Sequence, residues 1–320
     1  MRILVTGAAG FIGANLCREL ASRPEVGHLI ALDDLSTGFA ENLSGVSAEV
    51  VEGSILDRRL LDGTVDGVDA VIHLAALPSV PRSLAHPLRT FEVNATGTVQ
   101  LLEACRRQLV PVVAASSSSV YGSVGVSPKH EDLPTRPLSP YAASKLAAEA
   151  SVLAYGTAFG LPALVFRLFN VYGPLQSAGH PYAAVIPVFI DAALRGEPLL
   201  IHGSGRQVRD FTFVGTVVKV LADAAIGRVA SPVPVNLAFG TRVTITDLAE
   251  RVAAAAGVRP DVRTGPGRAG DVPDSQADSG RLRRLFPHVQ PVPLDEGLAR
   301  TVAWFRQSQL PAAGPAQAGG

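Results

Sequence analysis

The sequence predicts an α/β protein built on a doubly wound parallel sheet, with a smaller mixed lobe at its C-terminal end. Two observations predict this fold class. Short apolar runs alternate with segments of helical spacing through the first half of the chain, which is typical of a parallel sheet covered by helices on both faces. Beyond about Gly173 proline and glycine become more frequent and the alternation loosens, which indicates a lobe of helices and loops.

Each expected strand is a short apolar run bounded by polar or turn residues. Because strand–helix–strand crossovers are right-handed, such runs wind into one sheet. The strands are expected at residues 3–5, 29–32, 48–52, 70–74, 110–115 and 164–168. Helices are expected between them at residues 11–21, 55–61, 87–108 and 140–159, and further along at 186–194, 246–256 and 294–306.

Composition excludes several classes of protein. Lysine plus arginine equals aspartate plus glutamate at 28 each, without the basic excess of a nucleic-acid binder. The two cysteines, Cys17 and Cys105, lie in helical patterns, so we expect buried thiols rather than a disulfide framework. The chain runs directly into its first strand and has no apolar stretch of the roughly 18 residues that span a bilayer. A soluble, cytoplasmic protein without a targeting segment is expected.

A glycine-rich turn joins the first strand to the first helix. Gly7, Gly10 and Gly13 allow a tight turn, and the free N–H groups of the helix then face the phosphates of a dinucleotide. Asp33 ends the second strand, where a carboxylate can accept hydrogen bonds from ribose hydroxyls. The next residue is Asp34, and no arginine follows directly that could bind the 2′-phosphate of NADP. This favours NAD over NADP.

A second motif, Tyr141 with Lys145 four residues later, indicates proton transfer. On one helix the two side chains share a face, and an ammonium group beside a phenol favours the phenolate, a usable base. The pattern is weak in isolation. It is strengthened by the preceding Pro140, which suits a helix start, and by the serine run at residues 116–119 that ends the fifth strand.

Taken together these motifs resemble the extended short-chain dehydrogenase/reductases, specifically the nucleotide-sugar epimerase/dehydratase group, with the epimerases of UDP-glucose and UDP-N-acetylglucosamine most similar. The resemblance covers about residues 1–306. The motifs are TGAAGFIG at 6–13, HLAA at 73–76, VNATGT at 93–98, SSSSVYG at 116–122, YAASK at 141–145, FNVYGP at 169–174 and RDF at 209–211.

The resemblance implies a role for each matching position and a Rossmann-type fold. Tyr141 is the implied base, Lys145 lowers its pKa and binds the nicotinamide ribose, and Ser117 is the hydroxyl of the triad. Ser54 stands where the family has an acidic residue. The implied NAD-binding residues are Gly7, Gly10, Phe11, Ile12, Gly13, Asp33, Ser54, Ile55, Leu74, Ala75, Ala76, Asn94, Tyr141 and Lys145. The implied substrate-binding residues are Ser79, Ser117, Ser118, Asn170, Val185, Ile186, Arg209, Arg268 and Ser275, and no metal ligands are expected.

The resemblance also implies a division of the chain. Residues 1–173 are expected to form the NAD-binding domain, to which residues 208–240 return. Residues 174–207 and 241–306 are expected to form the substrate lobe. Residues 307–320, rich in proline, alanine and glycine, are expected to be a disordered tail.

Within this group the residues after Ser117 discriminate between reactions. The related 4,6-dehydratases carry Asp-Glu there, whereas this chain has Ser118 and Ser119, which cannot perform the elimination. The implied activity is 4-epimerisation of a UDP-sugar, by oxidation at C4, rotation of the 4-keto sugar and return of the hydride. At Ser275 the family's bulkier tyrosine would restrict the C2 substituent, so serine leaves room for an N-acetyl group.

Two other function classes stay open, and one assembly is expected. The chain could be a reductase that releases product and exchanges its cofactor, or a dinucleotide-binding sensor without catalysis. A homodimer is expected through the helices at 87–108 and 140–159, because apolar residues occupy more than one face of each. These residues include Leu101, Leu102, Leu146 and Leu153.

Overall fold

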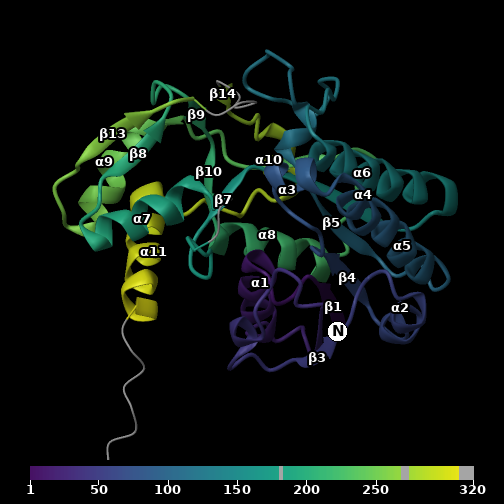
Figure 1. Ribbon diagram of the computed structural model, residues 1–320. Coiled ribbons are helices and arrows are strands. Elements are labelled where there is room, and N and C mark those ends of the chain that lie inside the picture. Colours follow the sequence, from purple (N-terminus) through teal and green to yellow (C-terminus); the bar gives the residue numbers. More distant parts are fainter. Residues whose placement is uncertain (180–182, 268–273, 310–320) are drawn as a thin grey trace, which may run out of the picture.

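The computed structural model describes residues 1–179, 183–267 and 274–309. Its centre is a seven-stranded sheet in the order β11-β6-β5-β4-β1-β2-β3, in which every neighbouring pair is parallel (Figure 1). The chain starts in the middle at β1, adds strands toward one edge, and then returns to add strands toward the other. The strands are β1 (Arg2–Thr6), β2 (His28–Asp33), β3 (Glu49–Glu52), β4 (Ala70–His73), β5 (Val112–Ser117), β6 (Ala163–Leu168) and β11 (Val235–Leu237).

Helices cover both faces of this sheet, so the predicted Rossmann-type fold is confirmed. Alternate residues of β1 enter different cores: Ile3 and Val5 pack with α1 (Phe11–Ala21) and α8 (Val214–Ile226), while Leu4 packs on the opposite side. That opposite core is covered by α2 (Arg58–Val65), α5 (Thr98–Arg106) and α6 (Pro140–Phe159). In such a sheet the switch in direction between β1 and β4 opens a crevice at the carboxyl ends of the strands.

The helix predicted at 87–108 is interrupted. It consists of α4 (Pro87–Phe91), the π-helical turn η2 (Glu92–Gly97) and α5, and a short helix α3 (Val80–Ala85) precedes it. The helix predicted at 55–61 begins later, as α2, because the Asp57 carboxylate caps it by accepting the N–H groups of Arg59 and Leu60.

Helix α8 was not predicted. It is rich in valine and apolar around its circumference, a pattern that also suits a strand, and it forms a helix because most of its residues are buried against the sheet and α1.

The smaller lobe lies at the other end of the molecule (Figure 1). It contains α7 (Val185–Arg195), α9 (Ile245–Ala256) and α11 (Leu294–Gln309), with α7 and α9 in contact. Three small sheets accompany them: β7 (Asn170–Tyr172) with β10 (Phe211–Phe213), β8 (Leu199–His202) with β13 (Val262–Gly265), and β12 (Val243–Thr244) with β9 (Val208–Arg209) and β14 (Asp274–Ser275). The remaining short elements are η1 (Ala40–Leu43), η3 (Ser118–Tyr121) and α10 (Gly280–Leu285).

Several expectations concern features beside the sheet. Cys17 and Cys105 are free and buried, as predicted, and burial raises the pKa of each thiol to about 12. None of the helices in the described ranges is long and apolar enough to cross a membrane. The exact domain boundaries stay a prediction, and most of the tail expected at 307–320 lies outside the described residues.

Some of the apolar residues expected on more than one face of these helices are covered within the subunit. Leu101 and Leu102 are fully buried inside the subunit, because α5 packs between α2 and α6. Leu146 and Leu153 are partly buried. Exposed apolar side chains near α6 lie on α3 and α4, where Leu84 is 65%, Leu88 86% and Phe91 44% exposed, and at the end of α6 itself, where Phe159 is 47% exposed.

Candidate active site

The predicted site residues gather at one edge of the sheet. Asp33 is the last residue of β2, and Ser117 is the last residue of β5. Gly7 follows β1 directly, and Leu74 follows β4 directly. Because all these strands are parallel, their carboxyl ends form one rim, where open α/β sheets bind their ligands. The structure therefore brings together residues more than a hundred positions apart in sequence.

The turn after β1 has no room for a side chain at Gly7 or Gly13. Gly7 has a φ of +71°, and a Cβ on it would lie 2.6 Å from the Ala75 nitrogen. A Cβ on Gly13 would lie 2.0 Å from the Gly7 carbonyl oxygen. Gly10 begins α1 without a side-chain cap, and no acidic residue lies in the first turn. This glycine cradle and open helix end fit the pyrophosphate of a dinucleotide.

Asp33 is held rigidly beside this turn. Its carboxylate accepts the N–H groups of Ala9 and Leu35, each at 2.8 Å, and the side chain is only 9% exposed. Burial raises its pKa, while the backbone hydrogen bonds oppose that rise. Each carboxylate oxygen keeps a second acceptor position, so the group can still accept ribose hydroxyls.

A buried chain of hydrogen bonds connects β1 to the π-helical turn. Burial lowers the pKa of His73 to about 3, so its ring is neutral. The Thr98 hydroxyl donates to the Asn94 carbonyl oxygen at 2.6 Å, so it accepts from His73 Nε2 at 2.9 Å. His73 Nδ1 must then accept from the Thr6 hydroxyl at 2.7 Å. The chain fixes the tautomer of His73 and the position of the loop after β4.

Asn94 joins that loop to α6. It lies in the π-helical turn and is 1% exposed. Its side chain accepts the Leu77 N–H at 2.7 Å and donates to the Leu77 carbonyl at 3.1 Å and to the Ser144 hydroxyl at 3.0 Å. Irregular helical turns of this kind are frequent at functional sites. Ser144 is the residue before Lys145, so Asn94 also positions the helix that carries the candidate base.

Ser117 ends β5, and Tyr141 and Lys145 lie one turn apart at the start of α6. Helix α6 starts sharply, because Pro140 is its first residue and the Ser139 hydroxyl accepts the Ala142 N–H at 3.1 Å. Burial raises the pKa of Tyr141, while a hydrogen bond with Ser117 lowers it. In the protein without cofactor, desolvation of the phenolate outweighs the effect of Ser117, so the pKa of Tyr141 is raised. The lowered pKa expected from the sequence stays a prediction for the NAD-bound protein.

Lys145 is also buried, at 7% exposure. Burial lowers its pKa to about 8, and the negative charge of Glu149 opposes that effect. Glu149, one turn further along α6, forms a buried ion pair with Arg167 at 2.6 Å and accepts the Ser116 hydroxyl at 2.6 Å. At neutral pH Tyr141 is thus a neutral phenol, and Lys145, one turn further along α6, is an ammonium ion.

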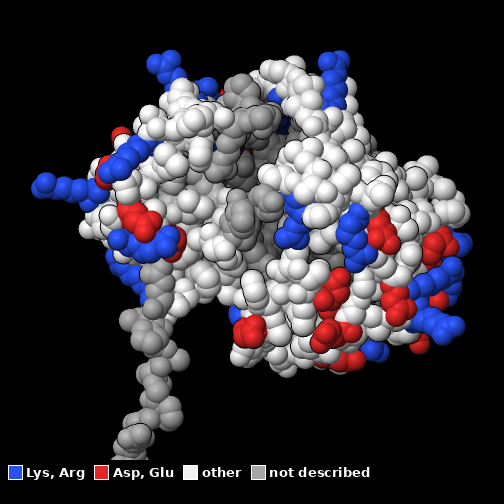
Figure 2. All heavy atoms as spheres, viewed as in Figure 1, with Lys and Arg blue, Asp and Glu red and all other residues white. Residues whose placement is uncertain are grey.

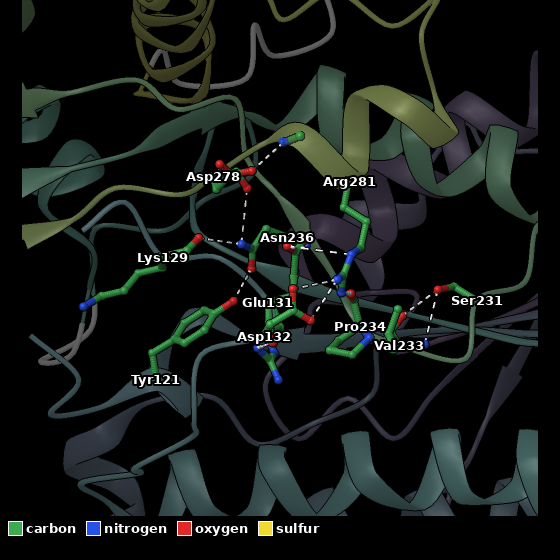
Figure 3. Close-up of polar contacts among 12 residues, drawn as sticks. Tyr121, Lys129, Glu131, Asp132, Ser231, Val233, Pro234, Asn236, Asp278 and Arg281 are labelled. Atoms are coloured by element: carbon green, nitrogen blue, oxygen red, sulfur yellow. Dashed lines mark hydrogen bonds and ion pairs between the residues drawn. The ribbon is translucent and has the colours of Figure 1, made fainter. Parts of the chain in front are cut away.

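A second buried network supports the turn after Ser117 (Figure 3). The Tyr121 hydroxyl donates to Asn236 at 2.7 Å, and the Arg167 guanidinium lies 4.7 Å from the Tyr121 ring centroid. Asn236, on β11, also donates to the carbonyls of Lys129 at 2.8 Å and Asp278 at 3.3 Å. The sheet is thereby tied to the segment that follows β14.

Part of the predicted substrate set lies on the short strands β7, β9 and β14. Arg209 and Ser275 are register partners on the neighbouring strands β9 and β14. Asn170 begins β7 and donates to the Asp210 carbonyl at 3.2 Å. Ser79, before α3, has a φ of +92°, a strained conformation that is often found at functional sites. Arg268 lies outside the described residues.

The remaining predicted residues are placed as follows. Val185 and Ile186 open α7, Phe11 and Ile12 open α1, Ser54 and Ile55 follow β3, Ala75 and Ala76 follow β4, and Ser118 opens η3. Ile55 contacts the backbone of the π-helical turn so closely that a Cβ on Gly97 would lie 2.6 Å from it.

Sequence reasoning missed the supporting polar residues. His73, Glu149 and Asn236 are buried and hydrogen-bonded beneath the site. Only Glu149 carried a usable signal: a carboxylate one turn after Lys145, on the same side of a mostly apolar helix.

Comparison with known proteins identifies the family. A family model described as the NAD dependent epimerase/dehydratase family matches residues 3–238. The chain belongs to this family. It is 38% identical over 314 residues to a UDP-glucose 4-epimerase of Mycolicibacterium smegmatis, covering 96% of this chain and 99% of the relative.

Two solved structures of the family are similar along the whole chain. A UDP-N-acetylglucosamine 4-epimerase from Methanobrevibacter ruminantium M1, in complex with UDP-N-acetylmuramic acid, has a TM-score of 0.90 and 34% identity, covering 96% of this chain and 98% of that one. A dTDP-glucose 4,6-dehydratase from Streptomyces venezuelae, with NAD and TYD bound, has a TM-score of 0.86 and 34% identity, covering 96% and 97%. The predicted family and the NAD cofactor are confirmed, and the chain is an enzyme of the epimerase/dehydratase family.

Proposed function

We propose that this NAD-dependent enzyme is a 4-epimerase of UDP-sugars. Two features of the sequence carry the proposal. The chain has the set Ser117, Tyr141 and Lys145, and the two residues directly after Ser117 are serines, Ser118 and Ser119. A 4,6-elimination needs an acid and a base at C5 and C6 of the sugar, and serine hydroxyls are poor at both roles. Redox at C4 needs only one base beside a hydride acceptor.

The residues of this chain would act as follows. Bound NAD supplies the hydride acceptor, which later returns the hydride, and its positive charge favours ionisation of a neighbouring phenol. Tyr141 takes the proton from O4 of the sugar, directly or through Ser117. Lys145 remains protonated at neutral pH and stabilises the phenolate electrostatically. Tyr141 would return the proton to O4 of the product sugar.

Inversion requires that the keto sugar turns while the nucleotide stays bound. A guanidinium matches phosphate oxygens, so Arg209, and Arg268 by the family pattern, would hold the pyrophosphate. Ser275 lies beside Arg209 on the adjacent strand. The residue proposed to face the sugar and the residue proposed to bind the pyrophosphate therefore belong to one small sheet. This arrangement supports a fixed nucleotide and a mobile sugar.

We also propose a homodimer formed through α6 and the neighbouring helices. Leu84, Leu88 and Phe91 are exposed on α3 and α4, both of which contact α6. Ala150 and Ala154 are exposed on α6, and small residues allow close helix approach. An apolar surface of this kind is typical of a protein interface.

A product assay tests the proposed function. Purified protein with bound NAD is incubated separately with UDP-glucose, UDP-N-acetylglucosamine and dTDP-glucose, and the products are separated by sugar-specific chromatography. The expected result is interconversion of gluco and galacto forms of the UDP-sugars, with NAD retained through gel filtration. A 4-keto-6-deoxy product would indicate a dehydratase, and stoichiometric NADH release would indicate a net dehydrogenase.

A further inference from the structure

The turn after Ser117 places a second hydroxyl against the triad. Ser119 Oγ lies 2.9 Å from Ser117 Oγ, and the Ser119 N–H lies 3.2 Å from the same atom. Ser117 also lies close enough to Tyr141 to lower the pKa of its phenol. A serine hydroxyl has one proton to donate and two lone pairs that accept. The two contacts from Ser119 are accepted by Ser117, so the proton of Ser117 remains available to donate toward Tyr141.

The direction of this chain follows from the state of Tyr141. A phenolate can only accept, so Ser117 must donate its proton to an ionised Tyr141. Ser117 can then only accept from Ser119, whose hydroxyl becomes the donor. Hydrogen bonds in such a chain polarise one another, so a donor behind Ser117 strengthens the bond to the phenolate.

Resting on the proposed function, we propose that Ser119 is a positioning residue for catalysis: its hydroxyl holds Ser117 as a donor to Tyr141 and so favours the ionised base. This role differs from that of a substrate contact, because Ser119 acts through Ser117.

The surroundings make this turn a rigid support. Ser118–Tyr121 forms one 3₁₀ turn, which Tyr121 anchors through its hydrogen bond to Asn236 (Figure 3). The Arg136 N–H donates to the Val120 carbonyl oxygen at 3.0 Å, which fixes the turn from the other side. Ser119 is therefore held in place independently of Ser117.

Few other groups around this end of β5 and α6 titrate near neutral pH. Lys145 on α6 has a pKa of about 8, and His73 on β4 is neutral above a pKa of about 3. Glu149 and Arg167 neutralise each other in a buried pair, and Tyr121 has a raised pKa. When bound NAD favours ionisation of Tyr141, a shift of the acidic side of the pH profile reports on that group.

The test compares the pH dependence of kcat and KM for the holoenzyme and three variants. Ser119→Ala removes the hydroxyl but leaves the backbone N–H, and Ser119→Thr restores a hydroxyl. Ser123→Ala is the matched control, an exposed serine in the next stretch of chain. We expect Ser119→Ala to move the acidic limb upward by about half a pH unit and to lower kcat at pH 7 about threefold, with KM unchanged. Ser119→Thr should recover most of the difference.

Two outcomes would overturn the inference. If the acidic limb of the pH profile has the same position in Ser119→Ala as in the parent, Ser119 does not influence the base. A raised KM with an unmoved limb would make Ser119 a substrate contact instead.

A spectroscopic titration separates failure of this inference from failure of the proposed function. The phenolate absorbance of the NAD-bound protein is recorded against pH, and the titration of the Tyr141→Phe variant is subtracted to isolate Tyr141. The apparent pKa should be higher in Ser119→Ala than in the parent, whichever sugar reaction the enzyme performs. Equal values would contradict the inference even if epimerisation is observed.

Discussion

Lys145 and Glu149 are both buried on α6, one helical turn apart, and the carboxylate keeps the pKa of the lysine higher than burial alone would leave it. The ion pair with Arg167 fixes that carboxylate at 2.6 Å, so it cannot turn to neutralise the ammonium directly. Lys145 is thereby kept charged at neutral pH, and no carboxylate in the described ranges forms an ion pair with it. Its charge remains available to a phenolate.

The alkaline limb of the pH profile should come from Lys145. With a pKa of about 8 in the folded protein, the ammonium is present below pH 8 and is lost above it. Turnover should therefore fall as the pH rises through 8. Arginine remains protonated in this range, so Lys145→Arg should be slower at pH 7 but show no decline up to about pH 9.5. The same decline in both proteins would assign the limb to another group.

The carboxylate of Asp33 should determine NAD affinity. Asp33→Asn keeps the size but loses the charge, and a hydrogen bond to a charged group contributes roughly 1.5–3 kcal/mol. NAD binding to stripped protein, measured by calorimetry, should weaken about 10- to 100-fold. Asp34→Asn is the control, because that carboxylate is hydrogen-bonded to Ser36 instead. An equal loss in both variants would show that general charge, rather than Asp33, binds the cofactor.

The proposed dimer should depend on the exposed apolar side chains of α3 and α4. Leu88 is 86% exposed, and Leu88→Arg places a charge at the centre of that surface. Light scattering at micromolar concentration should change from dimer to monomer, because an unpaired charge is costly in an interface core. Leu200→Arg, in an exposed position of β8, should leave the dimer intact. A parent protein that is already monomeric would refute the proposal.

Ser275 should control which sugars enter the pocket. Ser275→Tyr adds a ring beside Arg209, and the clash should exclude sugars with an acetamido group at C2 while sparing plain hexoses. The measurement is the ratio of kcat/KM for UDP-N-acetylglucosamine to that for UDP-glucose. Ser275→Ala removes the hydroxyl without adding bulk and should leave the ratio unchanged. A change of less than about threefold in the tyrosine variant, under 1 kcal/mol, would show that Ser275 does not gate the pocket.

Much of the sheet could be predicted because its strands are buried on both faces and read as short apolar runs. The β1 and β4 runs end at Thr6 and His73, close to the expected limits. The π-helical turn around Asn94 could not be predicted, because local propensity favours an unbroken helix there and only tertiary hydrogen bonds to Leu77 and Ser144 favour the irregular turn. Helix α8 could not be predicted because it is rich in valine, which has a low helix propensity. Burial of these valines, rather than their propensity, determines that the segment is helical.

The site was predictable where function depends on spacing along the chain. The role of Gly7 and Gly13 could be predicted from the order of strand, turn and helix alone. The pairing of Tyr141 with Lys145 could be predicted from their spacing on a helix. The raised pKa of Tyr141 could not be predicted, because burial depends on what the rest of the fold places around the ring. The same applies to His73, whose neutral ring is set by partners on three different elements.

The most direct test of the account is turnover of the Tyr141→Phe variant. General-base catalysis typically contributes about 100- to 10,000-fold, so kcat for UDP-glucose epimerisation should fall by at least two orders of magnitude. Its thermal midpoint and NAD retention should stay close to those of the parent, because the ring and its packing remain. A variant that keeps activity within threefold of the parent would contradict the assignment of Tyr141 as the base.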